Sequence, residues 1–193
     1  MPADAGHRAP EPTTATGRDL VDAIVDGWRR EIPGLDGPQH ELARRASRLE
    51  QLLEQALLDC LAPWNLTKAD FSVLGALRIA GAPYELRPTD IRRRLLLTSG
   101  GVANVLNRLE RMGLADRIPD PNDGRSSWVR LTGAGITVAD QTARAWAATQ
   151  DRLFSGLSPR LARQAADILR AVLLAVGDWE PAPAATRQAV RVE

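Results

Sequence analysis

The sequence predicts a mainly α-helical protein built around a winged helix-turn-helix, with further helices on both sides of that lobe. Three observations lead to this prediction. Apolar residues recur at helical spacing through most of the chain, and the turn "TSGG" separates two of the shorter helices. The alternation typical of strands occurs only in "LADRIP" and "SSWVRLT", which flank the turn residues "DPNDGR". The order helix, turn, helix, hairpin defines the fold class.

Two helices are expected ahead of this lobe. In residues 18–32 the apolar side chains fall on one face, and Pro33 with Gly34 ends the segment. Residues 40–61 repeat the pattern as far as Pro63. We therefore assign residues 18–62 to N-terminal and dimerisation helices. Residues 1–17 and 180–193 are rich in Pro, Ala and Thr without apolar periodicity, which indicates disordered tails.

The helices of the lobe, residues 63–132, are predicted from their end signals. Thr67 precedes "KADFSVLGALRIAG" as an N-cap with Asp70 three residues later, close to a capping box. Pro88 stands at a first helical position, where its missing N–H costs little. Thr98 is the expected N-cap of a helix over residues 99–112, and Gly113 follows as its C-terminal glycine.

Two long helices are expected after the hairpin, over residues 136–154 and 158–176. Ser158 is placed as the N-cap of the second helix, with Pro159 as its first residue. Trp146 and Phe154 stand among alanines in the first helix, and we interpret them as dimer core rather than as lining of a ligand site. Residues 133–179 are therefore assigned to C-terminal dimerisation helices.

The composition argues against an enzyme. The chain has one cysteine, and its two histidines have no partners at metal-ligand spacing, so no metal or cofactor is predicted. Neither an activated nucleophile nor a phosphate-binding loop is recognisable. No apolar run is long enough to cross a membrane, and the first residues lack the apolar centre of a signal peptide. The expected location is the cytoplasm.

Charge is distributed unevenly although the total is near zero. Residues 1–60 hold seven arginines and eleven carboxylates, whereas residues 86–131 hold nine arginines and five carboxylates. A basic block next to an acidic segment is typical of a nucleic-acid-binding surface. The predicted partner is therefore double-stranded DNA.

The helix over residues 99–112 has the composition of a recognition helix. Val102, Val105, Leu106, Leu109 and Met112 share one face, and small or hydrogen-bonding side chains share the other, which a major groove about 12 Å wide can admit. Asparagine amides suit adenine, arginine suits guanine or phosphate, and the helix N-terminus suits a phosphate. The predicted DNA contacts are Thr98, Ser99, Gly100, Ala103, Asn104, Asn107, Arg108 and Arg111.

The hairpin is predicted to be the wing. Arg125 stands at its tip, where it can enter a minor groove, and Asp123 can hold the guanidinium in one direction. Ser126 next to it is included among the DNA contacts. Trp128 is expected to share one strand face with Arg130, while Val129 and Leu131 face the core.

The chain resembles MarR-type transcriptional regulators in three motifs, "LTKADFSVLGAL", "LLLTSGGVANVLNRLERMGLADR" and "PDPNDGRSSWVRLTGAG". The resemblance implies a homodimer whose first and last helices interlock and whose recognition helices contact a palindromic operator, with half-sites roughly 34 Å apart. It also implies a regulator, expected to be a repressor, that a small molecule releases from DNA. The wing differs from the family in having Gly124 where a basic residue is usual.

The additional N-terminal helix and "PYELRPTDIRRRLLLTSG" are similar to the urate-responsive subgroup of the family. By that resemblance Trp28, Ser72 and Arg117 are candidate ligand residues. Ser72 stands where the subgroup has an aspartate, and Val105 stands where it has an arginine, so we expect a less charged aromatic effector and no tight binding of urate. Trp28 can equally be a core anchor of its helix.

Several alternatives remain open from the sequence. The lobe can be a winged-helix association module, which Gly124 favours, or a regulator without any effector pocket. Cys60 can sense peroxide, as in some members of the family, or simply pack in the interior. No cation adjoins Cys60 in the sequence to stabilise a thiolate, which favours packing.

Overall fold

The structure, a computed structural model, describes residues 17–32, 34–96, 98–120 and 123–178, without the side chains of residues 123–126. The chain divides into two units, residues 1–53 and 54–193, and each is described by itself. Both predicted tails lie outside the described residues, apart from Gly17.

The first unit holds α1 (Leu20–Glu31) and most of α2 (Pro38–Leu61). Asp19 caps α1 and forms a full capping box with Asp22, in which each side chain accepts the backbone N–H of the other residue, at 2.9 and 2.8 Å. Arg45 of α2 bonds to both of these carboxylates, at 2.9 and 2.6 Å. Val21 and Val25 are buried, so apolar packing and this ion-pair network together hold α1.

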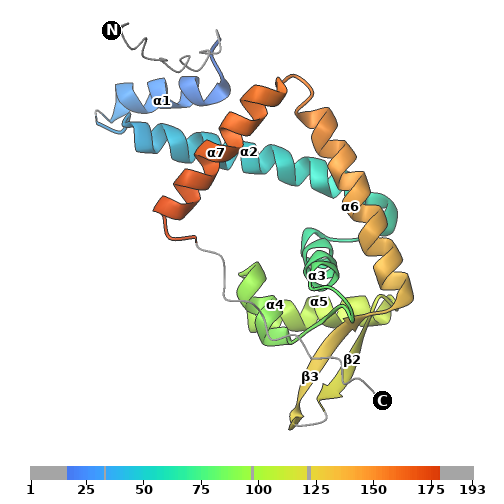
Figure 1. Cartoon of the computed structure of the whole chain (residues 1–193). Coiled ribbons are helices and arrows are strands. Elements are labelled where there is room, and N and C mark those ends of the chain that lie inside the picture. The colour runs from blue at the N-terminus through green and yellow to red at the C-terminus, as the bar shows by residue number, and fades with distance from the viewer. Residues whose placement is uncertain (1–16, 33, 97, 121–122, 179–193) are drawn as a thin grey trace, which may run out of the picture. The chain divides into compact units, whose positions relative to one another are not determined.

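The second unit contains a three-stranded antiparallel sheet and the remaining helices (Figure 1). Its elements in chain order are η1 (Ala62–Trp64), α3 (Lys68–Ile79), β1 (Glu85–Leu86), α4 (Pro88–Leu95), α5 (Ser99–Arg111), β2 (Ala115–Asp120), β3 (Asp123–Leu131), α6 (Gly133–Leu153) and α7 (Pro159–Ala175). The mainly helical winged helix-turn-helix predicted from the sequence is confirmed.

The end signals of the helices act as predicted. Thr67 and Asp70 form a capping box at α3, with bonds of 3.1 and 2.8 Å, and Thr98 accepts the N–H of Gly101 at 3.0 Å at the start of α5. Gly113 has a φ of +69° directly after α5. The start of α6 differs from the prediction, because Thr132 caps this helix and it begins at Gly133 rather than at residue 136.

The sheet has one strand more than the sequence analysis predicted. β1 pairs with β3 through Glu85 opposite Arg130 and Leu86 opposite Val129, so β3 lies in the centre of the sheet. Val129 belongs to the main core together with leucines of α3 and α5. Trp128 lies on the other face of β3, as predicted, and is nevertheless almost fully buried.

The last two helices differ in how they pack. α6 contacts α3, where Arg78 pairs with Asp140 at 2.7 Å and also stacks over the ring of Tyr84. The hydrogen bond from Arg78 lowers the pKa of Asp140 below its usual value. α7, in contrast, has no buried residue along its 17 positions. No helix among the described residues is long and apolar enough to cross a membrane.

Candidate nucleic-acid interface

The buried face of α5 fixes its orientation in the lobe. Val102, Val105, Leu106 and Leu109 all lie in the core, at the spacing i, i+3, i+4 and i+7 of one helix face. Met112 was predicted to share this face, but that prediction is wrong. The residue forms the C-cap of α5, and 36% of its surface is exposed.

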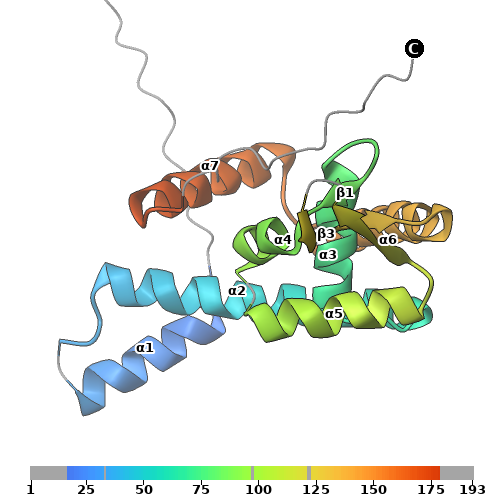
Figure 2. The same ribbon diagram turned by 90° about the horizontal axis from the view of Figure 1, so that it is seen from below.

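The opposite face of α5 is open to solvent. Its exposed positions lie mainly in the first two and a half turns and carry small or amide side chains rather than large ones. Figure 2 shows α5 running along the side of the group formed by α3, α4 and the sheet. The exposed residues among those predicted to contact DNA are Thr98, Ser99, Gly100, Ala103, Asn104, Asn107 and Arg111.

Arg108 does not lie on that open face with its neighbours. Its Nε is 2.9 Å from Oδ2 of Asp70, a carboxylate with no exposed surface, and its Nη2 donates to the backbone carbonyl of Asn65. A guanidinium paired with a fully buried carboxylate is held firmly, because parting the two would leave the carboxylate uncompensated in the interior. In this structure Arg108 therefore attaches α5 to the first turn of α3.

A second network runs between α5 and β2. Arg117 donates from Nε to Glu110 at 2.5 Å and from Nη2 to the amide oxygen of Asn107 at 2.9 Å. The amide oxygen of Asn107 thus already accepts a hydrogen bond, whereas its NH₂ group has no acceptor among the described residues. Asn104, one turn earlier on the open face, has no such intramolecular contact in the described part of the chain.

The basic residues of α4 were not among the predicted DNA contacts. Arg92 and Arg93 are both exposed, and Arg93 lies 3.7 Å from Asp90. Arg92 lines a hollow of about 330 Å³ between α4, the start of α5 and β2, together with Ser99 and Arg117. The run "RRR" in a short helix directly before the turn was the available signal.

The backbone of the wing follows the predicted hairpin. β2 and β3 pair in antiparallel register from Ala115 opposite Leu131 to Pro119 opposite Ser127, with a shift in register between Pro119 and Asp120. The side chains of Arg125 and Ser126 lie outside the described residues, so their predicted contacts with DNA stay predictions.

Comparison with known proteins identifies the lobe. The model of the MarR family matches residues 64–126. The regulator PecS of Dickeya dadantii (strain 3937) is 32% identical over 121 residues, which cover 63% of this chain and 73% of PecS. The chain belongs to the MarR family.

Other members of the MarR family give the same result. The multiple antibiotic resistance protein MarR of Escherichia coli K12 is 31% identical over 100 residues, which cover 52% of this chain and 67% of MarR. A crystal structure of a mutant E. coli MarR complexed with operator DNA superposes with a TM-score of 0.62 at 26% identity and covers 76% of this chain and 97% of that one. The protein is thus a DNA-binding transcriptional regulator of the MarR family and not an enzyme.

The candidate effector residues lie in different parts of this MarR-family chain. Trp28 belongs to the first unit and is 36% exposed. Ser72 lies on α3, where its hydroxyl donates to the carbonyl of Lys68 at 2.8 Å, and it lines a hollow of about 250 Å³. Arg117 lines the separate hollow beside α5, and Val105 is buried. The membership of the urate-responsive subgroup therefore stays a hypothesis.

Two further predictions concern reactive and metal-binding groups. Cys60 is a free thiol, half-buried near the end of α2, and its role in packing or in peroxide sensing stays a prediction. Among the described residues, no group of histidine, cysteine and carboxylate side chains is arranged to hold a metal ion.

Proposed function

We propose that the protein is a homodimeric repressor that binds a palindromic operator through α5 and the wing. The observation that carries the proposal is the exposed amide and small-residue face of α5, presented by a helix whose other face is fixed in the core. MarR, a relative of this chain, is named as the multiple antibiotic resistance repressor in a structure at 27% identity and a TM-score of 0.59. Such a regulator would act in the cytoplasm.

The proposed contacts fall into two chemical classes. Asn104 reads a base edge and Asn107 can donate its NH₂ group, while Gly100 and Ala103 let the helix approach the duplex. A Cβ added at Gly100 would meet no atom within 4 Å, so packing inside the protein does not require a glycine there. Thr98, Ser99, Arg111, Arg125 and Ser126 would contact phosphates or the minor groove. Arg108 would act indirectly by holding α5 against α3.

The proposal is tested by the salt dependence of DNA binding. We expect the affinity for a duplex selected by the protein from a random library to fall steeply between 50 and 200 mM salt, because arginine contacts release counterions from phosphates, by roughly 10³-fold if about six phosphates are neutralised. Arg125→Ala should weaken binding about tenfold. Fluorescence anisotropy measures both effects. An affinity independent of salt would instead favour the winged-helix association module.

The dimer is supported by the surface of α7. Leu161, Ile168, Leu169, Leu173 and Val176 are all at least 40% exposed in the single chain. They repeat at helical spacing, and an isolated helix of this length is marginal in water. A second copy of the chain that covers this face would give α7 the packing that the single chain lacks.

A charge on that face should separate the protomers. We expect Ile168→Asp to convert the dimer to a monomer at micromolar concentration, because the carboxylate would be buried without a partner. Arg163→Asp, on an exposed polar position of the same helix, is the matched control and should remain dimeric. Sedimentation velocity distinguishes the two, and a dimeric Ile168→Asp variant would rule out α7 as the interface.

The effector is proposed to be a small aromatic molecule of low charge. Ser72 offers a hydroxyl in place of a carboxylate, and Arg117 is already paired with Glu110, so an anionic purine must compete for it. Loss of one charged contact costs roughly 1.5 to 3 kcal/mol. Isothermal titration with urate should therefore show no micromolar binding. Micromolar binding that Trp28→Ala removes would contradict this expectation and place the chain in the urate-responsive subgroup.

A further inference from the structure

Trp128 is buried in an unusual place. It lies on the face of β3 opposite to the core, is only 4% exposed, and does not belong to the main core cluster. The guanidinium carbon of Arg87 lies over the indole, 4.8 Å from the centre of the ring, which is the distance of a cation-π contact. Trp128 is therefore on the outer face of the sheet and is covered there by the guanidinium of Arg87.

The same two residues meet at one carboxylate. Asp120 is 5% exposed and accepts hydrogen bonds from Nη2 of Arg87 at 2.7 Å and from Nε1 of Trp128 at 3.1 Å. The bond from the guanidinium is charge-assisted, and it joins a buried carboxylate to an arginine side chain that is 40% exposed. Arg87, Asp120 and Trp128 thus form one three-membered cluster, which we call the wing-root cluster.

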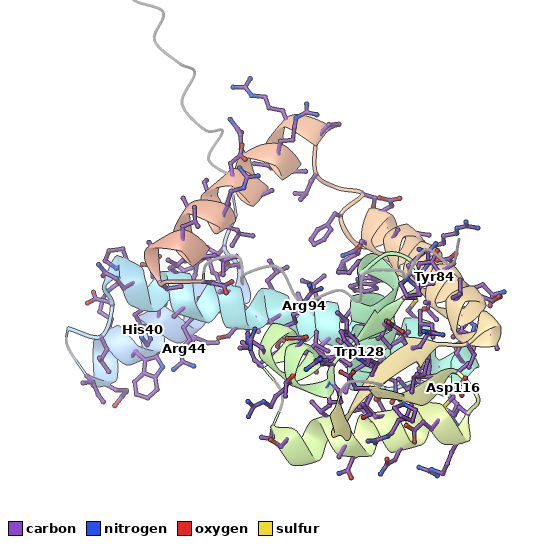
Figure 3. The ribbon with its side chains drawn as sticks, turned by 60° about the horizontal axis from the view of Figure 1, so that its bottom comes forward. His40, Arg44, Tyr84, Arg94, Asp116 and Trp128 are labelled. Carbon is purple, nitrogen blue, oxygen red and sulfur yellow. The ribbon has the colours of Figure 1, made fainter. Side chains whose placement is uncertain are left out.

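The members of the wing-root cluster come from the two parts of the lobe that are proposed to contact DNA. Arg87 immediately precedes Pro88, the first residue of α4, and so belongs to the start of the helix-turn-helix. Asp120 is the last residue of β2, directly before the turn of the hairpin, and Trp128 lies on β3. Figure 3 shows Trp128 beside α4. The wing-root cluster therefore joins the wing, β2 and β3, to the start of α4.

We infer that the wing-root cluster sets the direction of the wing relative to α4 and α5, and that Arg87 is a positioning residue rather than a DNA contact. β1 gives β3 only two paired residues on its other side, so backbone pairing with the rest of the lobe is short. Two linked binding elements strengthen each other only when their geometry lets both engage at once. This inference rests on the proposed contact between the wing and DNA.

A double-mutant cycle with the full-length protein tests the inference. The variants are Arg87→Ala, Trp128→Phe and Arg125→Ala, singly and with Arg125→Ala combined with each of the other two, on a duplex selected by the wild-type protein from a random library. Trp128→Phe keeps an aromatic side chain and the charges of Arg87 and Asp120, but it removes the bond from Nε1 to Asp120 and replaces the indole by a smaller ring. Arg125→Ala alone should lower the affinity for this duplex roughly tenfold. In either background we expect this loss to shrink to about twofold or less, because Arg125 in a misdirected wing no longer contacts DNA.

The chain supplies a matched control in Arg78. It also stacks on an aromatic ring, Tyr84 at 4.9 Å, and bonds to a carboxylate, Asp140 at 2.7 Å, but it joins α3 to α6 instead of the wing. Arg78→Ala should therefore leave the effect of Arg125→Ala at its full size. If Arg87 contacts phosphate itself, the effects of Arg87→Ala and Arg125→Ala will multiply and Arg87→Ala will lower the salt slope by about one. That result would overturn the inference.

A measurement without DNA separates the inference from the proposed function. In hydrogen exchange, Arg87→Ala should accelerate exchange at amides of β2 and β3 relative to the wild type and leave α6 unchanged, because the hairpin loses the anchor of the wing-root cluster and keeps the pair of Arg130 with Glu85. Unchanged protection of the hairpin would show that the cluster does not restrain the wing. If the hairpin loosens but the wild-type protein selects no duplex, the wing-root cluster stands and the proposed DNA contact fails.

Discussion

Gly135→Ala is expected to destabilise the protein by about 3 kcal/mol or more. Gly135 lies in the first turn of α6, and an added Cβ would stand 1.9 Å from the carbonyl oxygen and 2.9 Å from the carbonyl carbon of Leu114. Both atoms belong to the backbone between α5 and β2, which cannot rotate away as a side chain could. Relief of the clash requires a shift of α6 against the sheet.

Gly133→Ala is the control for this change. Gly133 is in the same turn of α6, but nothing lies within 4 Å of an added Cβ. Removing the backbone freedom of a glycine in an unstrained helical position should stabilise by about 0.5 to 1 kcal/mol. Denaturant unfolding at one fixed protein concentration compares the two variants. Equal stabilities would show that α6 does not approach Leu114 closely in solution.

Asn104→Ala is expected to weaken binding to the selected operator by roughly 10- to 150-fold, which corresponds to about 1 to 3 kcal/mol of base discrimination. Asn104 is exposed on α5, and its amide has no hydrogen-bond partner among the described residues, so its removal should cost the fold little stability. Affinity for non-specific DNA should stay unchanged, because phosphate contacts supply it.

The distinguishing outcome for Asn104 is the pattern across sequences. Competition binding with single-base variants of the operator should show lost discrimination at one position in each half-site and unchanged discrimination elsewhere. Thr137→Ala, at an exposed polar position on α6, is the control and should alter neither affinity nor discrimination. A uniform loss over all sequences would instead assign Asn104 to phosphate contact.

Several helices of the lobe and the last helix, α7, were predictable because their signals are local. Each helix start is marked by residues within one turn of it: Thr67 with Asp70 at α3, Thr98 at α5, and Ser158 with Pro159 at α7. The buried face of α5 was predictable from the helical spacing of its apolar residues. β1 gave no such signal, because two residues are too few to show an alternating pattern. The preceding Tyr84 has a φ of +63°, and a tyrosine in the sequence does not predict a positive φ.

The polar contacts of the interface were less predictable than its helices. A helical wheel places Arg108 beside Asn104 and Arg111, but a long side chain on the flank of a helix can turn inward when a buried carboxylate is in reach. Asp70 was interpreted only as a helix cap, and its second role depends on a residue 38 positions later in the chain. The same holds for Arg87, whose partners lie 33 and 41 positions away.

The anchoring of Arg108 limits how this regulator can be redirected to new operators. Randomising Arg108 would produce mostly proteins that misfold or in which α5 is misoriented, since Asp70 would remain buried without its cation. The positions that tolerate diversity are the exposed ones in the first half of α5, at Gly100, Ala103 and Asn104. A library for altered operator specificity is therefore small enough to sample completely, and its variants would share one unchanged scaffold.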